Sequence, residues 1–270
     1  MSGVRWNVIF LLVGGLLALQ GAAPPSSGAQ TSPASPGPAA GQVNQVESVT
    51  LAHGVKSASP FGSGLLTPVD PAATFVSTDV PYAIVRIKAL APDTTVALRL
   101  AGPTGSAYAV QAKIPGHRGN PKDFDFAAPL YILGTDLESR TGTWHLQVLI
   151  NNTPANDVTF QWQTATAAEL ARLKDAVNQS PLSADQHWRY GAALGLMGHL
   201  SDSITELQNA IRLDPNYALY YITLGRVYEQ QSRVSDATQQ FQKALSVHGS
   251  FYDSVFESWA RAGLVKLQAH

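Results

Sequence analysis

The residues with the greatest capacity for chemistry lie between His117 and Phe126, in the stretch HRGNPKDFDF. Asp123, Asp125 and the nearby Asn120 carry side-chain oxygens, the ligand type that a calcium ion takes. Alternating Asp and Phe is also the pattern of a strand edge whose carboxylates face solvent while two rings are buried. We favour the strand edge over the calcium site.

The rest of the sequence gives little support for catalysis. The sequence contains no Gly-x-Ser-x-Gly motif and no His-Glu-x-x-His motif. It also lacks the glycine-rich loops that bind phosphate or dinucleotides. The 7 histidines are scattered, and the chain has no cysteine for thiolate catalysis, disulfides or zinc binding. A net charge of −1 gives no basic surface for nucleic acid. We therefore expect no catalytic residue, no cofactor, no metal and no nucleic-acid partner.

The first residues have the layout of a secretory signal. Arg5 precedes an apolar run from Val8 to Leu19, and small residues and prolines follow it. A helix of this length spans about 18 Å, against the roughly 30 Å of a bilayer core. We expect residues 1–23 to be a signal peptide, and the protein to be exported to the periplasm or the exterior. An uncleaved segment that anchors the protein to a membrane is the alternative.

Residues 24–42 are rich in Pro, Ala, Ser and Gly and carry no charge. Such a segment cannot bury enough apolar surface to offset the entropy lost on ordering. We therefore expect it to be a flexible linker.

The hydrophobic period is two between residues 43 and 163, which is typical of strands in sheets that bury one face. The apolar rows are Ala83, Val85, Ile87 and Ala89; Val96, Leu98 and Leu100; and Trp144, Leu146, Val148 and Ile150. Turn residues separate these rows. About seven short strands in a segment of this length predict an antiparallel β-sandwich of immunoglobulin type.

This part also resembles a β-sandwich module of exported bacterial proteins. The resemblance is carried by FVSTDVPYAIVRIKAL, LAGPTGSAY and TGTWHLQVLINNTPANDVTFQW. It implies a fold and no particular activity.

The C-terminal part repeats itself at an interval of 34 residues, which separates Gly191 from Gly225 and Pro181 from Pro215. The glycines of the first pair, Gly191 and Gly225, allow two antiparallel helices to approach closely. The pattern resembles the tetratricopeptide repeat, with repeats over 184–217 and 218–251. We expect an all-α helical-repeat solenoid over 164–270, with flanking helices over 165–179 and 252–268.

The resemblance implies that the first helices of successive repeats line a concave groove for a partner segment. The groove positions are Asp185, Trp188, Ala192, Gly195, Leu219, Ile222, Arg226 and Glu229. Trp188 and Arg226 are the best anchors, because aromatic and guanidinium groups dominate binding energy at interfaces. In the alternative interpretation, Trp188 packs against the sandwich or the preceding helix and Arg226 pairs with Glu229.

These predictions together indicate a non-catalytic, exported protein that binds a protein partner or acts as a scaffold. An alternative is a sandwich that binds a glycan or cell-wall component, with the helices serving assembly. That alternative needs exposed aromatic side chains on the sandwich, such as Tyr108 or Tyr131, that form a flat platform.

Overall fold

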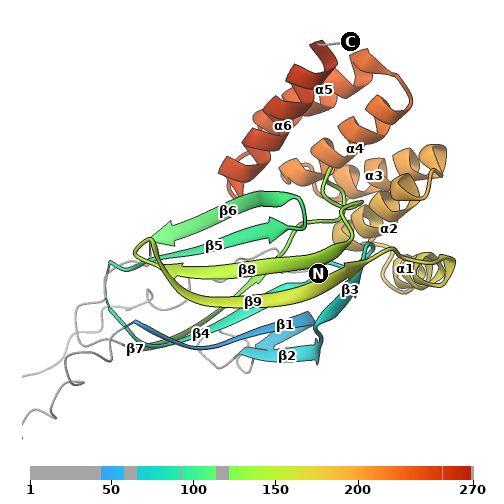
Figure 1. Ribbon diagram of the computed structural model, residues 1–270. Helices are drawn as coiled ribbons and strands as arrows, with labels where there is room; N and C mark the ends of the chain where they lie inside the picture. The colour runs from blue at the N-terminus through green and yellow to red at the C-terminus, as the bar shows by residue number, and fades with distance from the viewer. Residues whose placement is uncertain (1–43, 58–65, 92, 114–121, 251, 269–270) are drawn as a thin grey trace, which may run out of the picture.

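A computed structural model describes residues 44–57, 66–91, 93–113, 122–250 and 252–268. Strands occupy the N-terminal part of these residues and helices the C-terminal part (Figure 1), and we call the two parts the β region and the helical region. The predicted signal peptide and linker, residues 1–23 and 24–42, lie outside the described residues. Among the described helices, none has the length and apolar character that a membrane crossing requires.

The β region consists of two sheets, with strand orders β2–β1–β4–β7 and β3–β9–β8–β5–β6. Neighbouring strands are antiparallel, except that β3 and β9 are parallel. The immunoglobulin type of this arrangement stays a prediction. The strands are β1 (Gln45–Ser57), β2 (Leu66–Pro71), β3 (Thr74–Val76), β4 (Tyr82–Leu90), β5 (Thr95–Gly102), β6 (Gly105–Lys113), β7 (Lys122–Pro129), β8 (Gly142–Ile150) and β9 (Thr153–Gln163).

The apolar rows of the sequence face the core between the sheets, except at the end of the first row. The prediction is wrong for Ala89, because a register shift between Ile87 and Leu90 places Leu90 in the core instead. Val85 in β4 and Trp144 and Val148 in β8 are fully buried. Strand β4 differs from the expected one-sided pattern, because Ile84 on its other face is also buried, in a small cluster with Ala52, Leu66 and Ala127. The side chains that cover this second face come from β1, β2 and β7.

Asp123 and Asp125 lie in β7, an edge strand of the first sheet, which confirms the predicted strand edge. The expectation that both carboxylates face solvent holds for Asp123 and is wrong for Asp125, whose side chain is only 7% exposed. Asp125 pairs with Arg86 at 3.0 Å and Asp123 with Lys88 at 2.9 Å, both across to β4. Asn120 lies outside the described residues.

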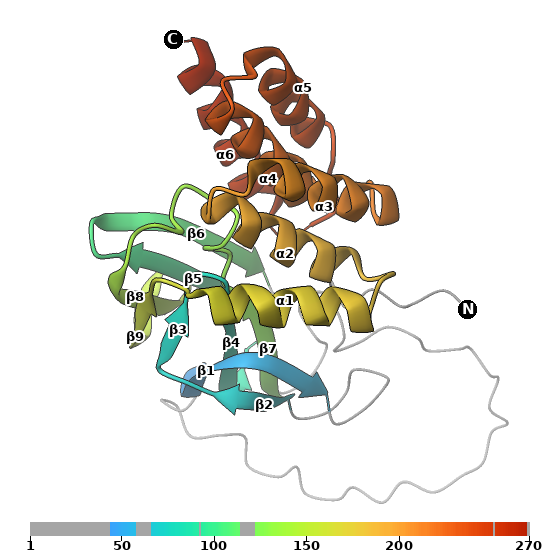
Figure 2. The ribbon, with the colours of Figure 1, turned by 90° about the vertical axis from the view of Figure 1, so that its right-hand side faces the viewer.

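Six helices form the described part of the helical region, and they stack in chain order away from β3 (Figure 2). Each of α2 and α4 packs against the helix that follows it, as expected for two helical hairpins. The helices are α1 (Ala167–Gln179), α2 (Ala184–Leu196), α3 (Leu200–Leu213), α4 (Ala218–Gln230), α5 (Val234–Leu245) and α6 (Asp253–Gln268).

The two glycines that set the 34-residue interval lie where the helices of each hairpin approach most closely. A Cβ atom on Gly191 would lie 2.9 Å from Cγ of Leu207, and one on Gly225 would lie 2.8 Å from Cε1 of Phe241. Real Cβ atoms do not approach other atoms so closely, so any larger residue would push the hairpin apart. The structure thereby confirms the reason for glycine at this repeat position.

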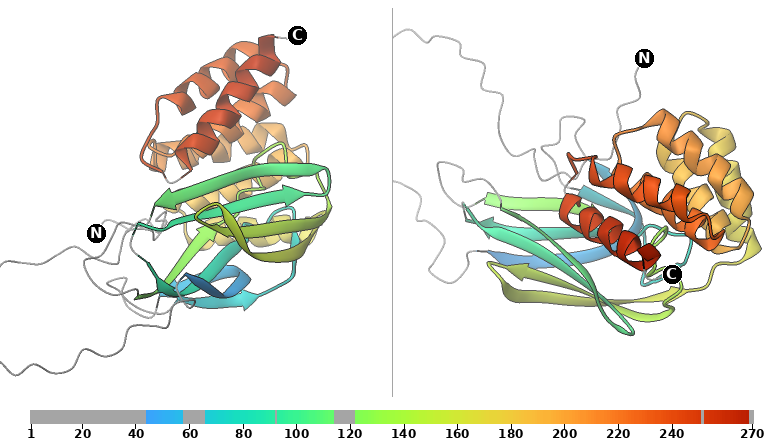
Figure 3. Two further views of the ribbon diagram at one scale, coloured as in Figure 1. Left: turned by 60° about the vertical axis from the view of Figure 1, so that its left-hand side comes forward. Right: turned by 90° about the horizontal axis from the view of Figure 1, so that it is seen from above.

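The two regions share one hydrophobic core. A single cluster of buried side chains runs from the inner faces of the sheets into α2, α4 and α6. Helix α6 lies against β6 at the edge of the second sheet (Figure 3), where the rings of Trp259 and Tyr108 meet edge to face. The chain is therefore held together by tertiary packing as well as by the peptide link between β9 and α1.

Candidate functional site

The connection between β7 and β8 enters the helical region (Figure 1). Residues 130–138, with the sequence LYILGTDLE, form no strand, yet all of them except Asp136 are buried. We call them the β7–β8 segment. Loops usually run over the surface, because their backbone polar groups need partners. This segment must therefore be held by specific contacts.

Tyr131 is the centre of these contacts. Its ring is 6 % exposed, and its backbone N–H donates to the hydroxyl of Tyr108 at 2.8 Å. Its own hydroxyl forms a hydrogen bond with that of Tyr217. Burial raises the pKa of Tyr131 well above its ordinary value, so the hydroxyl stays protonated. The ring contacts four aromatic side chains of the helical region: Trp188, Tyr217, Tyr252 and Phe256.

Gly134 makes the closest approach of the segment to the helices. Its φ of +77° favours glycine, and a Cβ atom there would lie 2.8 Å from Oγ1 of Thr223 and 3.2 Å from Nε1 of Trp188. The indole N–H of Trp188 donates to the Thr223 hydroxyl at 3.0 Å, and that hydroxyl lies 3.2 Å from the Gly134 carbonyl oxygen. The backbone of Gly134 is thus packed against and hydrogen-bonded to side chains of α2 and α4.

Glu138, the last residue of the β7–β8 segment, forms an ion pair with the helical region. One of its carboxylate oxygens accepts the backbone N–H of Gly134 at 2.8 Å, and the other lies 3.4 Å from Nη1 of Arg226 on α4. Both partners favour the ionised carboxylate, but burial outweighs them and raises the pKa of Glu138. The ion pair joins the two regions across 88 residues of sequence.

The groove predicted from the sequence is therefore not open along its whole length, because the protein's own β7–β8 segment fills part of it. Five of the predicted positions are buried: Trp188, Ala192, Gly195, Leu219 and Ile222. Binding of a partner at these positions stays a prediction.

The remaining three predicted positions form ion pairs. Asp185 pairs with Arg189 on its own helix, and Glu229 pairs with Lys266 of α6. The alternative interpretation is confirmed for Trp188, which packs against Tyr131 of the β region. It is wrong for Arg226, whose partner is Glu138 rather than Glu229.

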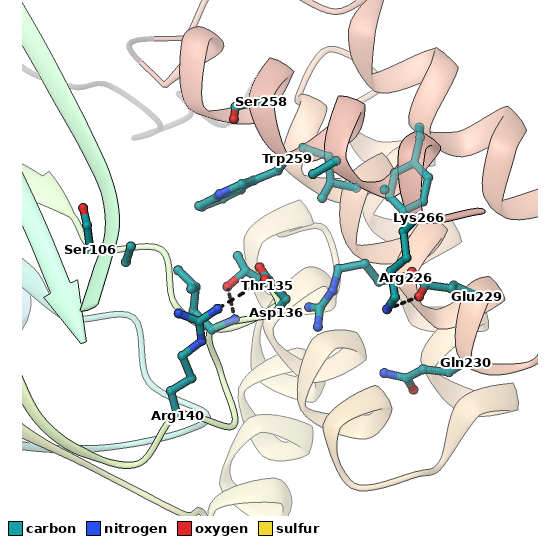
Figure 4. Close-up of a pocket in the computed structure, with 16 residues that line it drawn as sticks. Ser106, Thr135, Asp136, Arg140, Arg226, Glu229, Gln230, Ser258, Trp259 and Lys266 are labelled. Atoms are coloured by element: carbon teal, nitrogen blue, oxygen red, sulfur yellow. Dashed lines mark hydrogen bonds and ion pairs between the residues drawn. The ribbon is translucent and has the colours of Figure 1, made fainter. Parts of the chain in front are cut away.

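The unfilled end of the groove is a cleft of about 450 Å³ between the two regions (Figure 4). Its walls come from α4, α6, the end of the β7–β8 segment and the start of β6. Three of the predicted groove residues, Ile222, Arg226 and Glu229, line it. The other lining residues used below are Leu137, Arg140, Trp259 and Lys266.

Comparisons with known proteins agree with the repeat pattern. The family model described as "TPR repeat" matches residues 196–232. The C-terminal region contains tetratricopeptide repeats. Tetratricopeptide repeat protein 6 of Homo sapiens is 26% identical over 107 residues, which are 37% of this chain, and the chain spans 21% of the length of that relative. These matches indicate a protein-interaction or scaffold role for the tetratricopeptide array.

A solved structure titled "Crystal structure of MamA" is also similar in part. It is 24% identical, and the match covers 37% of this chain and 65% of that chain with a TM-score of 0.29.

The aromatic platform required by the glycan-binding alternative is not formed by the two tyrosines considered for it. Tyr108 and Tyr131 are both buried, and their rings face the tetratricopeptide array rather than solvent. These two residues would have to lie flat on an open surface to stack on a sugar. The condition that the glycan-binding alternative sets is therefore not met by Tyr108 and Tyr131.

No local pattern marks Arg140, Trp259 or Lys266 as cleft residues, because each is brought there by long-range packing. One signal of the segment itself is present in the sequence. The run Leu130–Leu133 is apolar without alternation and ends at Gly134, which is a pattern for a buried segment that is not a one-sided strand.

The raised pKa of Glu138 predicts a pH dependence of stability. A carboxyl group with a higher pKa in the folded state holds its proton more tightly there, so the free energy of unfolding falls as pH rises from the unfolded pKa through the folded pKa. Glu138→Gln should remove this fall. Denaturant unfolding between about pH 4 and pH 8 measures the difference between wild type and variant.

We expect the stability advantage of wild type over Glu138→Gln to shrink with increasing pH. Glu257→Gln, which changes an exposed glutamate of α6, is the matched control. A difference that stays constant across the pH range would show that Glu138 does not carry the burial-driven shift.

Proposed function

We propose that this protein is a non-catalytic, exported interaction protein that binds a segment of a partner protein in the cleft between the tetratricopeptide array and the β region. The observation that carries the proposal is the cleft itself. It continues the predicted groove beyond the β7–β8 segment and retains Arg226, one of the two predicted anchors. The repeat match supports the interaction role.

Displacement of the β7–β8 segment by a partner is an unfavourable alternative. The segment contributes five large buried side chains to the common core: Leu130, Tyr131, Ile132, Leu133 and Leu137. At about 1.5–3 kcal/mol for each such side chain, exposing all of them costs on the order of 10 kcal/mol. This is comparable with the whole stability of an ordinary domain, about 5–15 kcal/mol. A partner is therefore better served by the cleft than by the filled groove.

The size and lining of the cleft suit a short segment. Binding clefts of about 300–1,000 Å³ are common for ligands that rely on apolar walls and a few placed polar groups. Here Trp259 and Ala262 supply accessible apolar surface, while Arg140 and Arg226 supply donors. In this arrangement the β7–β8 segment fixes the angle between the two regions, and the cleft receives the partner.

Export remains part of the proposal and is supported by the sequence alone. Arg5 and the apolar run Val8–Leu19 have the order of a secretory signal. The proposed location is the periplasm or the exterior, with anchoring to a membrane as the alternative if the segment is retained.

Site-specific photo-crosslinking in the native cell tests the proposal. A benzophenone side chain replaces Ala262, which lines the cleft, and in the control protein it replaces Val265, which is 66% exposed on the same helix and lies outside the cleft lining. We expect a discrete crosslinked product from position 262 and none from position 265. Absence of a product at 262, or equal products at both positions, would count against the cleft as the partner site.

A further inference from the structure

Two guanidinium groups reach the cleft from opposite walls. Arg140 follows the β7–β8 segment and belongs to the β region, whereas Arg226 belongs to α4. Figure 4 shows both side chains turned toward the space between the walls. Their side chains are 30% and 21% exposed, so solvent and ligands can reach both.

The contacts that hold these guanidinium groups inside the protein are long. Arg226 lies 3.4 Å from Glu138, and Arg140 lies 3.6 Å from Asp136 and 3.4 Å from the hydroxyl of Thr104. Strong charge-assisted hydrogen bonds measure about 2.7–2.9 Å, and a guanidinium offers five N–H donors. Both groups therefore keep donors that a ligand carboxylate can accept from.

Other arginines of this protein form shorter ion pairs than Arg140 and Arg226 do. Arg189 meets Asp185 at 2.8 Å, and Arg261 meets Glu257 at 2.7 Å. The third cation of the cleft, Lys266, forms an ion pair with Glu229. The two guanidinium groups are thus the part of the cleft with unused capacity for an anion.

The carboxylates around the cleft do not use up the hydrogen-bond donors of Arg140 and Arg226. Glu229 is neutralised by Lys266, Glu138 is buried and also accepts the N–H of Gly134, and Asp136 is 68% exposed. Cations and carboxylates balance in number, so long-range attraction contributes little. Recognition must come from short-range, bidentate hydrogen bonds, which arginine forms with carboxylates.

Trp259 adds an apolar surface next to the guanidinium groups. Its ring is fixed edge to face against Tyr108, with centroids 5.4 Å apart, and it remains partly exposed at the cleft. Leu137 and Ala262 also line the cleft. Aromatic and arginine side chains in one pocket are the usual source of binding energy at interfaces.

We infer that the cleft binds an acidic peptide segment, with a carboxylate side chain between Arg140 and Arg226 and a neighbouring apolar side chain on Trp259. This inference rests on the proposed function, because it specifies the chemistry of the partner segment. A segment without a carboxylate leaves both guanidinium groups without a strong acceptor and binds more weakly.

Selection from a display library of random nine-residue peptides against the full chain tests the inference. We expect the selected peptides to contain Asp or Glu beside an aromatic or aliphatic residue, and the same peptides with Gln or Asn at that position to bind about tenfold more weakly. Arg140→Gln should reduce affinity for the acidic peptides by a similar factor. Arg261→Gln, on the outer part of α6, should leave it unchanged.

Two further variants keep the test independent of folding. The double change Glu138→Gln with Arg226→Gln removes the second guanidinium without leaving a buried carboxylate unpaired. Ala262→Trp fills the cleft, and Val265→Trp adds the same side chain outside it. We expect Ala262→Trp, but not Val265→Trp, to abolish binding.

The outcomes separate the inference from the proposed function. Selected peptides that need an open cleft but carry no acidic residue would overturn the inference and leave the proposed function standing. Selected peptides that bind Ala262→Trp as well as wild type would overturn both, and so would a library that yields no binding peptide.

Discussion

Tyr131→Ala is expected to lower the free energy of unfolding by about 3–5 kcal/mol, the range for removing a large aromatic side chain from a packed core. The residue is 6 % exposed and contacts four aromatic rings of the helical region. Its loss leaves a cavity between the two regions that rigid neighbours cannot fill. Urea unfolding, followed by helical circular dichroism and by tryptophan fluorescence, measures the effect.

Because Tyr131 belongs to a core shared by both regions, the two signals should shift together in this variant. Tyr131→Phe is the matched control. It keeps the ring and removes only the hydrogen bond to Tyr217, so its cost should be about 1 kcal/mol. An alanine variant no less stable than the phenylalanine variant would show that the ring does not pack against the helices.

Gly134→Ala is expected to cost about 2–5 kcal/mol, as the sum of two effects. An alanine at φ +77° pays the left-handed penalty of about 1–2 kcal/mol. Its Cβ would also lie 2.8 Å from Oγ1 of Thr223, and such overpacking costs about 1–3 kcal/mol. The measurement is the shift of the urea midpoint at constant slope.

Gly198→Ala separates the two effects. Gly198 has a similar φ of +82°, but a Cβ atom there meets nothing within 4 Å. Only the backbone penalty should appear in this control. Equal losses of stability in Gly134→Ala and Gly198→Ala would mean that the β7–β8 segment does not press against α4.

Much of the architecture could be predicted from the sequence, because periodicity is a local property. Alternation located the buried faces of β5 and β8, and the 34-residue interval identified the glycines that allow helix contact in both hairpins. The prediction was incomplete at β4, where Ile84 is buried on the second face. Burial of that face depends on neighbouring strands, so the strand's own sequence does not reveal it.

The candidate site could be predicted only in part. The groove positions followed from the repeat register, but their occupant lies 89 residues away in sequence, at the distance between Gly134 and Thr223. The pairing of Arg226 with Glu138 rather than with Glu229 has the same origin. A local rule favours the partner three residues along the helix, and tertiary packing overrides it.

Hydrogen exchange of the backbone amides in residues 130–138 tests the central claim most directly. The claim is that the β7–β8 segment is part of the core and fills one end of the groove, which leaves the cleft as the open site. We predict that the amides of this segment, apart from that of the exposed Asp136, exchange as slowly as those of β8, because both open only on global unfolding. Exchange as fast as that of Thr104, in the exposed turn between β5 and β6, would contradict the account, since the groove would then be free.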